Sequence, residues 1–256
     1  MKKLTAVLAA GAVLFSLAAC GSSSDAGSSA AGTAKSEGVM TYSEYAAAAL
    51  DTEVTIETYV QDKQGWWENE GVGNATFYTQ DAEGGYFLYN MPCTKEDYDA
   101  MVPGTKIKVT GYKSEWAGEV ELSFDLANEK NYEIESGDTY VATAQDLTAS
   151  FADEDALAAK QNTYATFKGL TVADSNGAAF LYNWDGSGSQ GDDIYFKLSD
   201  ANGNTRTFVI ESYLRGADTD VYKAVEALNV GDTVDVTGFL YWYEGPQVHT
   251  TDVVVK

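Results

Sequence analysis

Cysteine, proline and cationic side chains are all scarce in this chain of 256 residues. It holds two cysteines and three prolines, and 16 Lys and Arg stand against 39 Asp and Glu, for a formal net charge of −23 at pH 7. Cys20 and Cys93 alone cannot build a disulfide framework, and we expect Cys93 to be a small buried apolar residue. Because nucleic-acid affinity depends on Lys and Arg that meet phosphates, we expect nucleic acid and anionic lipid headgroups to be poor partners.

Catalytic signatures are also absent from the sequence. His249 is the only histidine, and no acid, base or metal ligand is identifiable beside it, so we expect an exposed or edge-strand residue. The sequence contains no Gly-x-Ser-x-Gly motif, no Cys/His pair and no phosphate-cradling glycine loop. We therefore expect neither enzymatic activity nor a cofactor.

One apolar run marks the N-terminus. Lys2 and Lys3 precede the stretch LTAVLAAGAVLFSL at residues 4–17, which is short for a transmembrane helix but suits the core of a signal peptide. The sequence LAAC that ends at Cys20 resembles the lipobox of bacterial lipoproteins. The resemblance implies removal of residues 1–19, lipid on the Cys20 sulfur, and a location outside the cytoplasm, anchored to the bacterial cell membrane. An ordinary secretory signal with an incidental cysteine is the alternative.

The segment that follows, residues 20–40, is rich in Gly, Ser and Ala. Such a composition cannot build a core, so it predicts a flexible tether between lipid and protein. Beyond it, many Val, Thr, Tyr and Gly residues favour β-structure with tight turns. We expect two domains there, at residues 41–136 and 137–256.

The first half of the folded part predicts three strands, a short helix and two more strands. Thr41 and Glu44 stand at capping-box spacing, which predicts a helix ahead of the first strand. Thr94 and Asp97 stand at the same spacing and predict the start of the helix between the third and fourth strands. The expected strands cover residues 53–60, 75–81, 85–91, 105–116 and 119–125, with a polar loop at 61–74.

The second half repeats this order. Thr143 and Asp146 stand at the capping spacing, and an acidic segment at residues 152–161 predicts a helix. The amphipathic pattern of residues 218–231 predicts a further helix before the last two strands. The expected strands cover residues 163–174 with a break at Gly169 and a continuation at 178–184, the hairpin 191–212 that turns at Asn202–Gly203, and the hairpin 232–255.

Two passages share a glycine pattern at a spacing of 127 residues. GTKIKVTGYKSEWAGEV begins at Gly104 and GDTVDVTGFLYWYEGPQV begins at Gly231, and the first passage aligns with the second without a gap as far as Gly118. A repeat spaced by about half the chain predicts an internal duplication. Gly111 and Gly238 fall inside the fourth expected strand of each half.

Five strands with a helix between the third and fourth resemble the OB-fold plan, here as two tandem Greek-key barrels in an otherwise all-β chain with short helices. The resemblance covers residues 41–256 and implies that Gly111 and Gly238 lie where the strands bend to close each barrel. The tetrapeptide FLYN occurs at 87–90 and 180–183, in different expected strands, and is not part of the repeat. A single β-sandwich is the competing architecture.

One segment of the sequence resembles a calcium-binding loop. Asp200, Asn202 and Asn204 stand at alternate positions, as the oxygen ligands of a calcium loop do. No glutamate closes such a loop, however, and Asn202–Gly203 between two alternating runs is a strong hairpin signal. We therefore expect a β-turn and no metal, with these three residues as a weak candidate site.

Aromatic residues are the remaining signal of function. Adjacent residues of a strand face opposite sides, so neither Trp66–Trp67 nor Tyr241–Tyr243 can be wholly buried in one core. The loops between strands one and two and between strands four and five border the ligand face of OB-folds. Capping of the barrel ends is the alternative role. The candidate ligand-binding residues are Trp66, Trp67, Tyr112, Trp116, Trp184, Tyr241, Trp242 and Tyr243.

The sequence therefore predicts a non-catalytic, lipid-anchored binding or scaffold protein outside the cytoplasm, with a carbohydrate, a peptide or an envelope protein as ligand. The alternative is a secreted OB-fold nucleic-acid-binding protein or nuclease. OB-fold thermonucleases use arginine with carboxylates, and this chain has only Arg206 and Arg215. A structural spacer without a ligand is a third interpretation.

Overall fold

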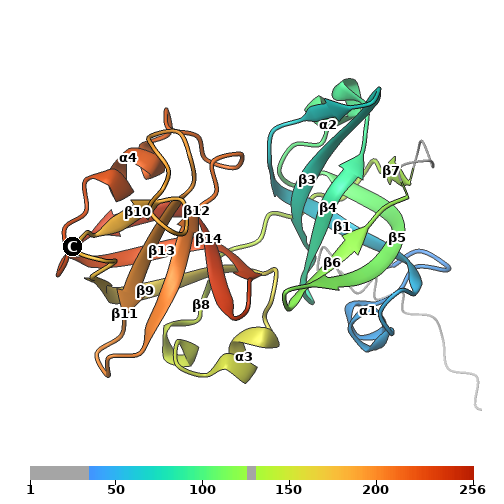
Figure 1. Cartoon of the computed structure of the whole chain (residues 1–256). Coiled ribbons are helices and arrows are strands. Elements are labelled where there is room, and N and C mark those ends of the chain that lie inside the picture. Colours follow the sequence, from blue (N-terminus) through green and yellow to red (C-terminus); the bar gives the residue numbers. More distant parts are fainter. Residues whose placement is uncertain (1–34, 126–130) are drawn as a thin grey trace, which may run out of the picture.

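The computed structural model describes residues 35–125 and 131–256. The predicted signal peptide, Cys20 and most of the predicted tether lie outside the described residues. The described chain forms two β-sheets that lie side by side, with β1 to β7 in one and β8 to β14 in the other (Figure 1). No helix within the described residues is long and apolar enough to cross a membrane.

The first sheet closes into a five-stranded barrel. Its path runs β1–β3–β4–β6–β5, and β5 pairs again with β1 to complete the ring. The pairs are antiparallel except for β4 and β6, which are parallel. Outside the ring, β2 pairs with β3 and β7 pairs with β5, both antiparallel. The strands are β1 (Glu53–Lys63), β2 (Trp67–Asn69), β3 (Val72–Gln80), β4 (Gly85–Pro92), β5 (Lys106–Trp116), β6 (Glu119–Ser123) and β7 (Tyr132–Ile134).

The second sheet repeats this topology. Its path runs β9–β11–β12–β14–β13, β13 pairs with β9 to close the ring, and β12 and β14 are the parallel pair. β8 and β10 are short additions at the edges of the ring. The strands are β8 (Gln145–Asp146), β9 (Tyr164–Ala173), β10 (Phe180–Tyr182), β11 (Ile194–Ser199), β12 (Thr205–Ile210), β13 (Thr233–Trp242) and β14 (Pro246–Val255).

Both barrels have the OB-like plan that the sequence predicts. In each, a short helix stands between the third and fourth barrel strands, α2 (Lys95–Ala100) in the first and α4 (Asp220–Glu226) in the second. Closed rings of five strands leave no pair of open sheets facing each other, so the alternative of a single β-sandwich is wrong. The chain is therefore a mostly β protein with tandem OB-like barrels and short helices.

The repeated glycines allow each barrel to close. A Cβ atom on Gly238 would lie 2.3 Å from the carbonyl oxygen of His249, and one on Gly111 would lie 2.9 Å from that of Ser123. Both contacts are shorter than real Cβ atoms make, so only glycine lets the fourth strand approach the fifth this closely. Beside Gly238 the register between β13 and β14 also shifts by one residue, which increases the local bend.

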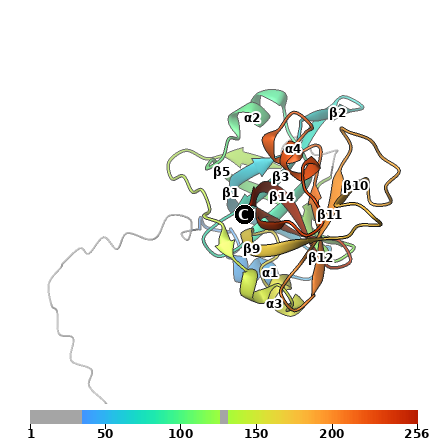
Figure 2. The same cartoon turned by 90° about the vertical axis from the view of Figure 1, so that its left-hand side faces the viewer.

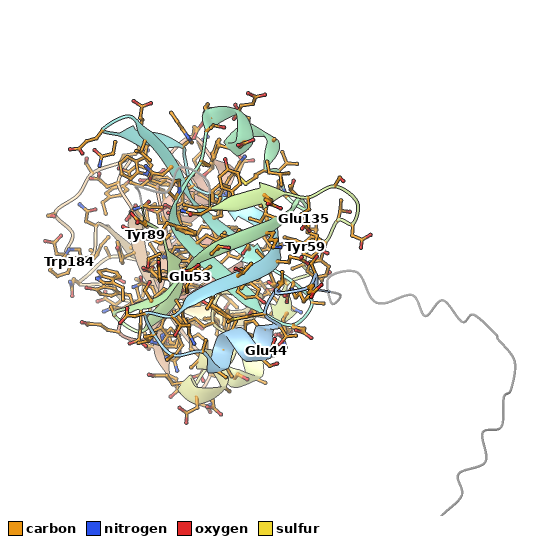
Figure 3. The ribbon with its side chains drawn as sticks, turned by 90° about the vertical axis from the view of Figure 1, so that its right-hand side faces the viewer. Glu44, Glu53, Tyr59, Tyr89, Glu135 and Trp184 are labelled. Atoms are coloured by element: carbon orange, nitrogen blue, oxygen red, sulfur yellow. The ribbon has the colours of Figure 1, made fainter. Side chains whose placement is uncertain are left out.

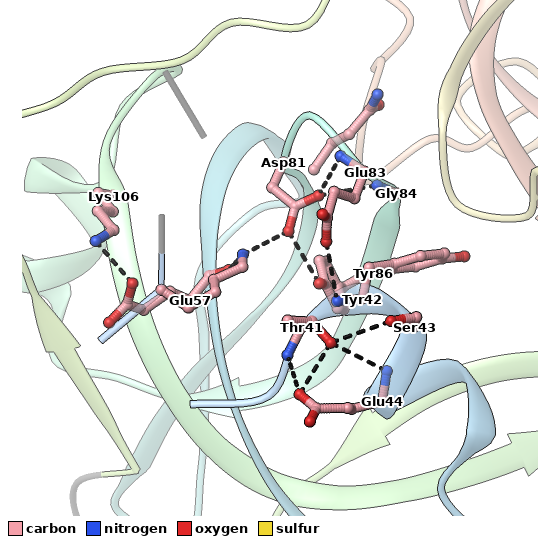
Figure 4. A network of polar contacts seen from close by, with 12 residues as sticks. Thr41, Tyr42, Ser43, Glu44, Glu57, Asp81, Glu83, Gly84, Tyr86 and Lys106 are labelled. Atoms are coloured by element: carbon pink, nitrogen blue, oxygen red, sulfur yellow. Dashed lines mark hydrogen bonds and ion pairs between the residues drawn. The ribbon is translucent and has the colours of Figure 1, made fainter. Parts of the chain in front are cut away.

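The first helix is held by the capping box that the sequence predicts. In α1 (Tyr42–Ala47), Thr41 Oγ1 accepts from the Glu44 amide, and the Thr41 amide donates to the Glu44 carboxylate (Figure 4). The sequence predicts this helix as far as about Leu50, but it ends at Ala47 because the backbone becomes extended at Ala48. There the C-terminal carbonyls of the helix, including that of Ala48, accept from the ammonium of Lys113, which satisfies groups that a helix end leaves open.

The described residues of the predicted tether, 35–40, contact the first barrel. Lys35 Nζ lies 2.6 Å from the buried carboxylate of Asp81 and also donates to the backbone oxygen of Glu57. Met40 forms a bridge with Ile56 of β1. Residues 35–40 are therefore packed against the first barrel, because their one cation meets a buried carboxylate there.

Three local predictions differ from the structure. Thr143 does not cap a helix; β8 follows it, Asp146 accepts from the Thr148 amide, and a 3₁₀ turn η1 (Thr148–Ser150) comes next. Gly169 does not break β9, because its φ of +66° lets the strand continue through an irregular register with β13. The predicted polar loop at 61–74 contains the end of β1 and the whole of β2. The acidic segment forms the short helix α3 (Glu154–Ala158).

A shared apolar cluster joins the two barrels. Tyr78 and Phe87 of the first barrel pack against Leu214 and Phe239 of the second, and the rings of Tyr78 and Phe239 stack with centroids 4.6 Å apart. Aromatic side chains bury large apolar areas and contribute strongly to such contacts. The barrels are thus fixed to each other by a small core of their own.

Hydrogen bonds lock the same junction. The amide of Gln161 bridges the β5–β6 turn by donating to the Gly118 carbonyl at 2.8 Å and accepting from the Val120 amide at 2.9 Å. The amide of Asn162 donates to the Val120 carbonyl. A Cβ on Gly85 would lie 2.1 Å from the Asn162 carbonyl oxygen, so that position also requires glycine. Backbone, amide and apolar contacts together hold the faces of the two barrels at a set angle.

Candidate binding cleft between the barrels

A cleft of about 1040 Å³ lies between the two barrels. Both barrels contribute to its walls from the loop between barrel strands one and two and from the region of the turn between strands four and five. In the first barrel the lining residues lie in residues 64–67, in β4 and at Trp116, the end of β5; in the second they lie in residues 175–184, β11, β12, residues 211–213 and the β13–β14 hairpin. This is the surface that OB-folds use for oligonucleotides and oligosaccharides, and here two such surfaces border one space.

Aromatic side chains dominate the cleft. Most of these rings are exposed, with Trp184 at 76 % and Tyr213 at 73 %. A group of exposed apolar side chains in one place is typical of a binding surface. Trp184 and Tyr89, one from each barrel, lie on the same side of the molecule (Figure 3). The aromatic residues that line the cleft are Trp67, Phe87, Tyr89, Trp116, Trp184, Tyr195, Phe196, Tyr213, Tyr241 and Tyr243.

The strand-four turns of the two barrels meet at one end of the cleft. The rings of Trp116 and Tyr243 are 5.2 Å apart and tilted by 45°, and the Glu244 amide donates to the Ala117 carbonyl at 2.8 Å. Positive φ angles at Ala117 and Glu244 make both turns tight enough to project these rings. Two loops far apart in the sequence therefore form one aromatic rim.

The loops after the first strand of each barrel border the cleft as well. β2 in the first barrel and β10 in the second lie at the same side of the molecule (Figure 2), and Trp67 and Leu181 from these strands both line the cleft. Gly65 donates to the Tyr213 carbonyl across the junction at 3.0 Å. That bond ties the first loop to the segment that carries the exposed Tyr213 ring.

The base of the cleft holds the only histidine. His249 is 6 % exposed, its ring stacks on Tyr241 with centroids 4.0 Å apart, and its Nδ1 lies 2.6 Å from the Tyr78 hydroxyl. The expectation of an exposed or edge-strand histidine is wrong, because the β12–β14 pairing places it against the first barrel. Burial lowers the pKa of His249 to about 3, so the ring is neutral near neutral pH.

A carboxyl group with a raised pKa also faces the cleft. Burial, and next the charge of Asp193, raise the pKa of Glu211 to about 7. Its carboxylate accepts from the Leu214 amide at 3.0 Å. Glu244 is the second carboxylate at the cleft and Lys197 the cation. The site thus combines rings with a few hydrogen-bonding and charged groups, as small-molecule and oligomer sites do.

The structure brings five of the eight aromatic candidates together: Trp67, Trp116, Trp184, Tyr241 and Tyr243 line the cleft. Trp66 instead packs on the first core and donates its indole N–H to the Cys93 carbonyl at 3.0 Å. Trp242 lies in the second core at 8 % exposure, and Tyr112 is exposed but does not line the cleft. The neighbours Trp66 and Trp67 face opposite sides, as strand alternation requires.

Several cleft residues lie outside the aromatic loops that the sequence predicts as the ligand face. Tyr89 and Tyr195 lie on barrel strands, and Tyr213 follows β12; nothing in their local sequence distinguishes them from core tyrosines. Lys197 and Ser175 stand out only once the strands are paired. The signal available in the sequence was the alternation along each strand, which separates two faces but does not say which face meets the other barrel.

The candidate calcium loop is a hairpin turn. The Asp200 carboxylate accepts from the amides of Asn202 and Asn204 and from the side-chain amide of Asn204, so its oxygens are used within the turn. Within residues 35–125 and 131–256, no group of three or more His, Cys, Asp or Glu could hold a metal ion. Cys93 is buried, as predicted, and burial raises its pKa to about 12.

No protein-family model matches the chain, and no curated protein matches it. Several solved structures are similar to it in fold, all at low identity. The HINb domain of p204 is 11 % identical with a TM-score of 0.32, over 78 % of this chain and 95 % of that one. A murine DNA-binding protein bound with double-stranded DNA is 11 % identical with a TM-score of 0.37, over 79 % and 96 %.

A replication protein A heterotrimer bound to single-stranded DNA is 10 % identical with a TM-score of 0.33, over 82 % of this chain and 51 % of that one. At these TM-scores, the OB-like assignment rests on the strand pairing described above. The expectation that nucleic acid is a poor partner is contradicted by these comparisons, in which two of the three neighbours are described as bound to DNA; the comparisons do not show what this chain itself binds. Net charge is a property of the whole surface, whereas binding is decided by the groups at one site.

Proposed function

We propose that the protein is a binding protein whose interdomain cleft holds an oligomer of ring-bearing units by stacking them on its aromatic side chains. One observation carries the proposal: the ligand faces of two OB-like barrels border one cleft, and exposed rings from both line it. A flat apolar ring face that stacks on a Trp or Tyr ring buries area that would otherwise meet water. Because the barrels are already fixed to each other, binding a ligand between them costs little conformational entropy.

An oligosaccharide is the first candidate ligand. Sugar rings present one apolar face for stacking and hydroxyl groups around the edge for hydrogen bonds. The cleft supplies amide and carboxyl groups for such edges, among them Asn90, Asn176, Gln247 and Glu211. Aromatic platforms with a few convergent polar groups are the usual composition of a site that selects one orientation of its ligand.

Single-stranded nucleic acid is the second candidate. The favouring observation is the position of the site, because strands two and three with their adjoining loops are where OB-folds bind oligonucleotides. Unpaired bases stack on aromatic rings, and each stacked base contributes roughly 1–3 kcal/mol. Lys197 at the cleft could meet one phosphate.

We propose further that binding in the cleft is not coupled to catalysis. His249 is the only imidazole, and its Nδ1 is engaged by the Tyr78 hydroxyl. Its pKa of about 3 would leave it a weak base at neutral pH. An oligomer that is recovered unchanged after prolonged incubation with the protein, by mass spectrometry, is the expected result.

The test is binding by matched aromatic variants. Trp67→Ala and Trp184→Ala each remove one cleft ring, and Tyr112→Ala removes an exposed ring away from the cleft. Binding is measured on a glycan array, and with fluorescent single-stranded oligonucleotides at low salt. We expect affinity for the bound class to fall about tenfold in each Trp variant and to stay unchanged in Tyr112→Ala. Equal binding by all four proteins would contradict the proposal.

The location of the protein is a separate proposal. The lipobox-like sequence supports attachment of lipid to Cys20 and display of the barrels outside the cytoplasm. Labelling of the expressed chain with a palmitate analogue tests it, with Cys20→Ala as control. Label in the wild type alone is expected, and equal label in the control would contradict it.

A further inference from the structure

A polar row crosses the second barrel at the floor of the cleft. Lys197 of β11 pairs with Thr207 of β12, Thr207 pairs with Gln247 of β14, and Gln247 pairs with Tyr241 of β13. All four residues line the cleft. Residues that are directly opposite on neighbouring strands project to the same face of a sheet, so this row forms one continuous strip toward the ligand.

Lys197 stands at the end of this row as an available cation. Its side chain is exposed and makes no ion pair within residues 35–125 and 131–256. Lys106 and Lys168, by contrast, each lie within 2.9 Å of a carboxylate. In a chain with a net charge of −23, a lysine that lines the candidate cleft and meets no carboxylate is suited to an anion from outside the protein.

A buried hydroxyl without a partner lines the same cleft, two residues beyond the end of β9, the strand that pairs with β11. Ser175 is 2 % exposed, lines the cleft, and its Oγ has no hydrogen-bond partner among the described residues. Ser175 follows β9 two residues after Ala173, and Ala173 pairs with Lys197. A buried hydroxyl that bonds to nothing is less favourable than a methyl group in the same place. At the edge of a cleft, such a group is available to a ligand atom.

We propose that Lys197 and Ser175 form a subsite for the carboxylate of an acidic sugar unit in the bound oligosaccharide. This inference rests on the proposed function and adds the chemical class of the ligand. The Lys197 ammonium meets one carboxylate oxygen and the Ser175 hydroxyl donates to the carboxylate. Thr207 and Gln247, next in the row, face the hydroxyl groups of the same sugar chain.

The other charges at the cleft make this subsite position-specific. Glu211 and Glu244 line the same cleft, and each of them, when ionised, repels a carboxylate that enters at its position. A uronic acid that places its carboxylate at Lys197 and neutral sugar units near Glu211 and Glu244 gains the attraction of the lysine and avoids repulsion by the two glutamates. Binding of the acidic oligomer therefore weakens with added salt, whereas binding of its neutral counterpart does not.

The experiment compares acidic oligosaccharides with their carboxyl-reduced counterparts. The probes are oligogalacturonate, a hyaluronan hexasaccharide and a glucuronoxylan fragment, each paired with its reduced, neutral form, together with a single-stranded oligonucleotide. Affinities are measured by titration calorimetry on wild type, Lys197→Gln, Ser175→Ala and Lys168→Gln. Lys168 is an exposed lysine of the same barrel that does not line the cleft, so Lys168→Gln is the matched control.

We expect the wild type to prefer one acidic oligomer over its reduced form by about tenfold. Lys197→Gln should abolish this preference, Ser175→Ala should reduce it about threefold without loss of thermal stability, and Lys168→Gln should leave it unchanged. Binding of both forms with equal affinity would overturn the subsite and leave the proposed function intact. Binding of neither form and no binding of the oligonucleotide would overturn the proposed function together with the subsite. Lys197-dependent binding of the oligonucleotide alone would overturn the assignment to a sugar.

Discussion

The hydroxyl of Tyr78 in the first barrel lies 2.6 Å from Nδ1 of His249 in the second. Tyr78 also accepts from the Gln64 side-chain amide at 3.1 Å, which leaves its own proton free to point at the imidazole nitrogen. Both residues are buried beneath the cleft. The one histidine of the chain therefore links the barrels beneath the candidate cleft without contributing a titratable group near neutral pH.

Loss of this link should destabilise the protein. Tyr78→Phe keeps the stacked ring and removes the hydroxyl, so it leaves His249 Nδ1 buried and unpaired, at about 1–3 kcal/mol. Tyr164→Phe, which loses a hydroxyl contact at 3.3 Å in a half-buried place, is the control and should cost less. Urea unfolding measures both. A Tyr78→Phe variant as stable as the control would show that the buried pair does not stabilise the junction.

Acid should weaken the fold through His249. Its pKa is lowered in the folded protein from 6.5 to about 3, so the unfolded chain takes up a proton first as the pH falls. The stability that depends on the neutral ring is present above pH 6.5 and is lost as the pH falls toward 3. Urea unfolding at several pH values, with His249→Gln beside the wild type, measures this. A variant whose loss of stability in acid equals that of the wild type would contradict the assignment.

Glu211 should act in the opposite direction. Its pKa is raised to about 7 from an ordinary value of 4.5, so the folded protein holds this proton more tightly than the unfolded chain. The corresponding stability is present below pH 4.5 and is lost as the pH rises through 7. Glu121 shows the same direction, also through burial, and its contribution remains in Glu211→Gln. That variant should therefore have a shallower decline in stability between pH 5 and 8; an unchanged slope would contradict the raised pKa.

The two glycines at the bends should not be interchangeable with alanine. In Gly238→Ala the new Cβ would meet the backbone of β14 at 2.3 Å, so the strands must separate, at a cost of about 1–3 kcal/mol, as for an overpacked core. Gly65→Ala is the control, because nothing lies within 4 Å of its Cβ position. Thermal unfolding should show a large loss for the first and little change for the second. Equal stability of the two variants would contradict the close approach of β13 to β14.

The strand order and the repeat could be read from the sequence because alternation and glycine spacing are local. Gly104 and Gly231, 127 positions apart, both adopt positive φ angles, as a true repeat requires. The N-cap residues Thr41 and Thr94 located α1 and α2 for the same reason. The prediction of a helix after Thr143 was wrong because the segment that follows pairs with β9 as β8. That pairing depends on residues about 20 positions further along the chain, which a local capping pattern does not show.

The site was only partly accessible in this way. Trp67 and Trp184 lie in segments that the sequence marks as polar loops between strands, where exposure is expected, whereas Trp242 follows Tyr241 at the end of a barrel strand. Which of these faces the core depends on the register of β13, and that register is set by its partners. His249 and Lys197 gain their roles only from the docking of one barrel on the other, which no local pattern records.

The most direct test of the shared cleft is the affinity of the bound oligomer as a function of its length. The measurement uses the best-binding ligand of the array, from two to eight units, on the wild type and on Trp67→Ala and Trp184→Ala, which remove one ring from each barrel. If both barrels bind the same oligomer, the affinity rises with oligomer length in the wild type. Each variant alone then loses most of this gain in affinity for long oligomers. Affinity that is independent of length, or a gain that survives in both variants, would contradict a cleft shared by the two barrels.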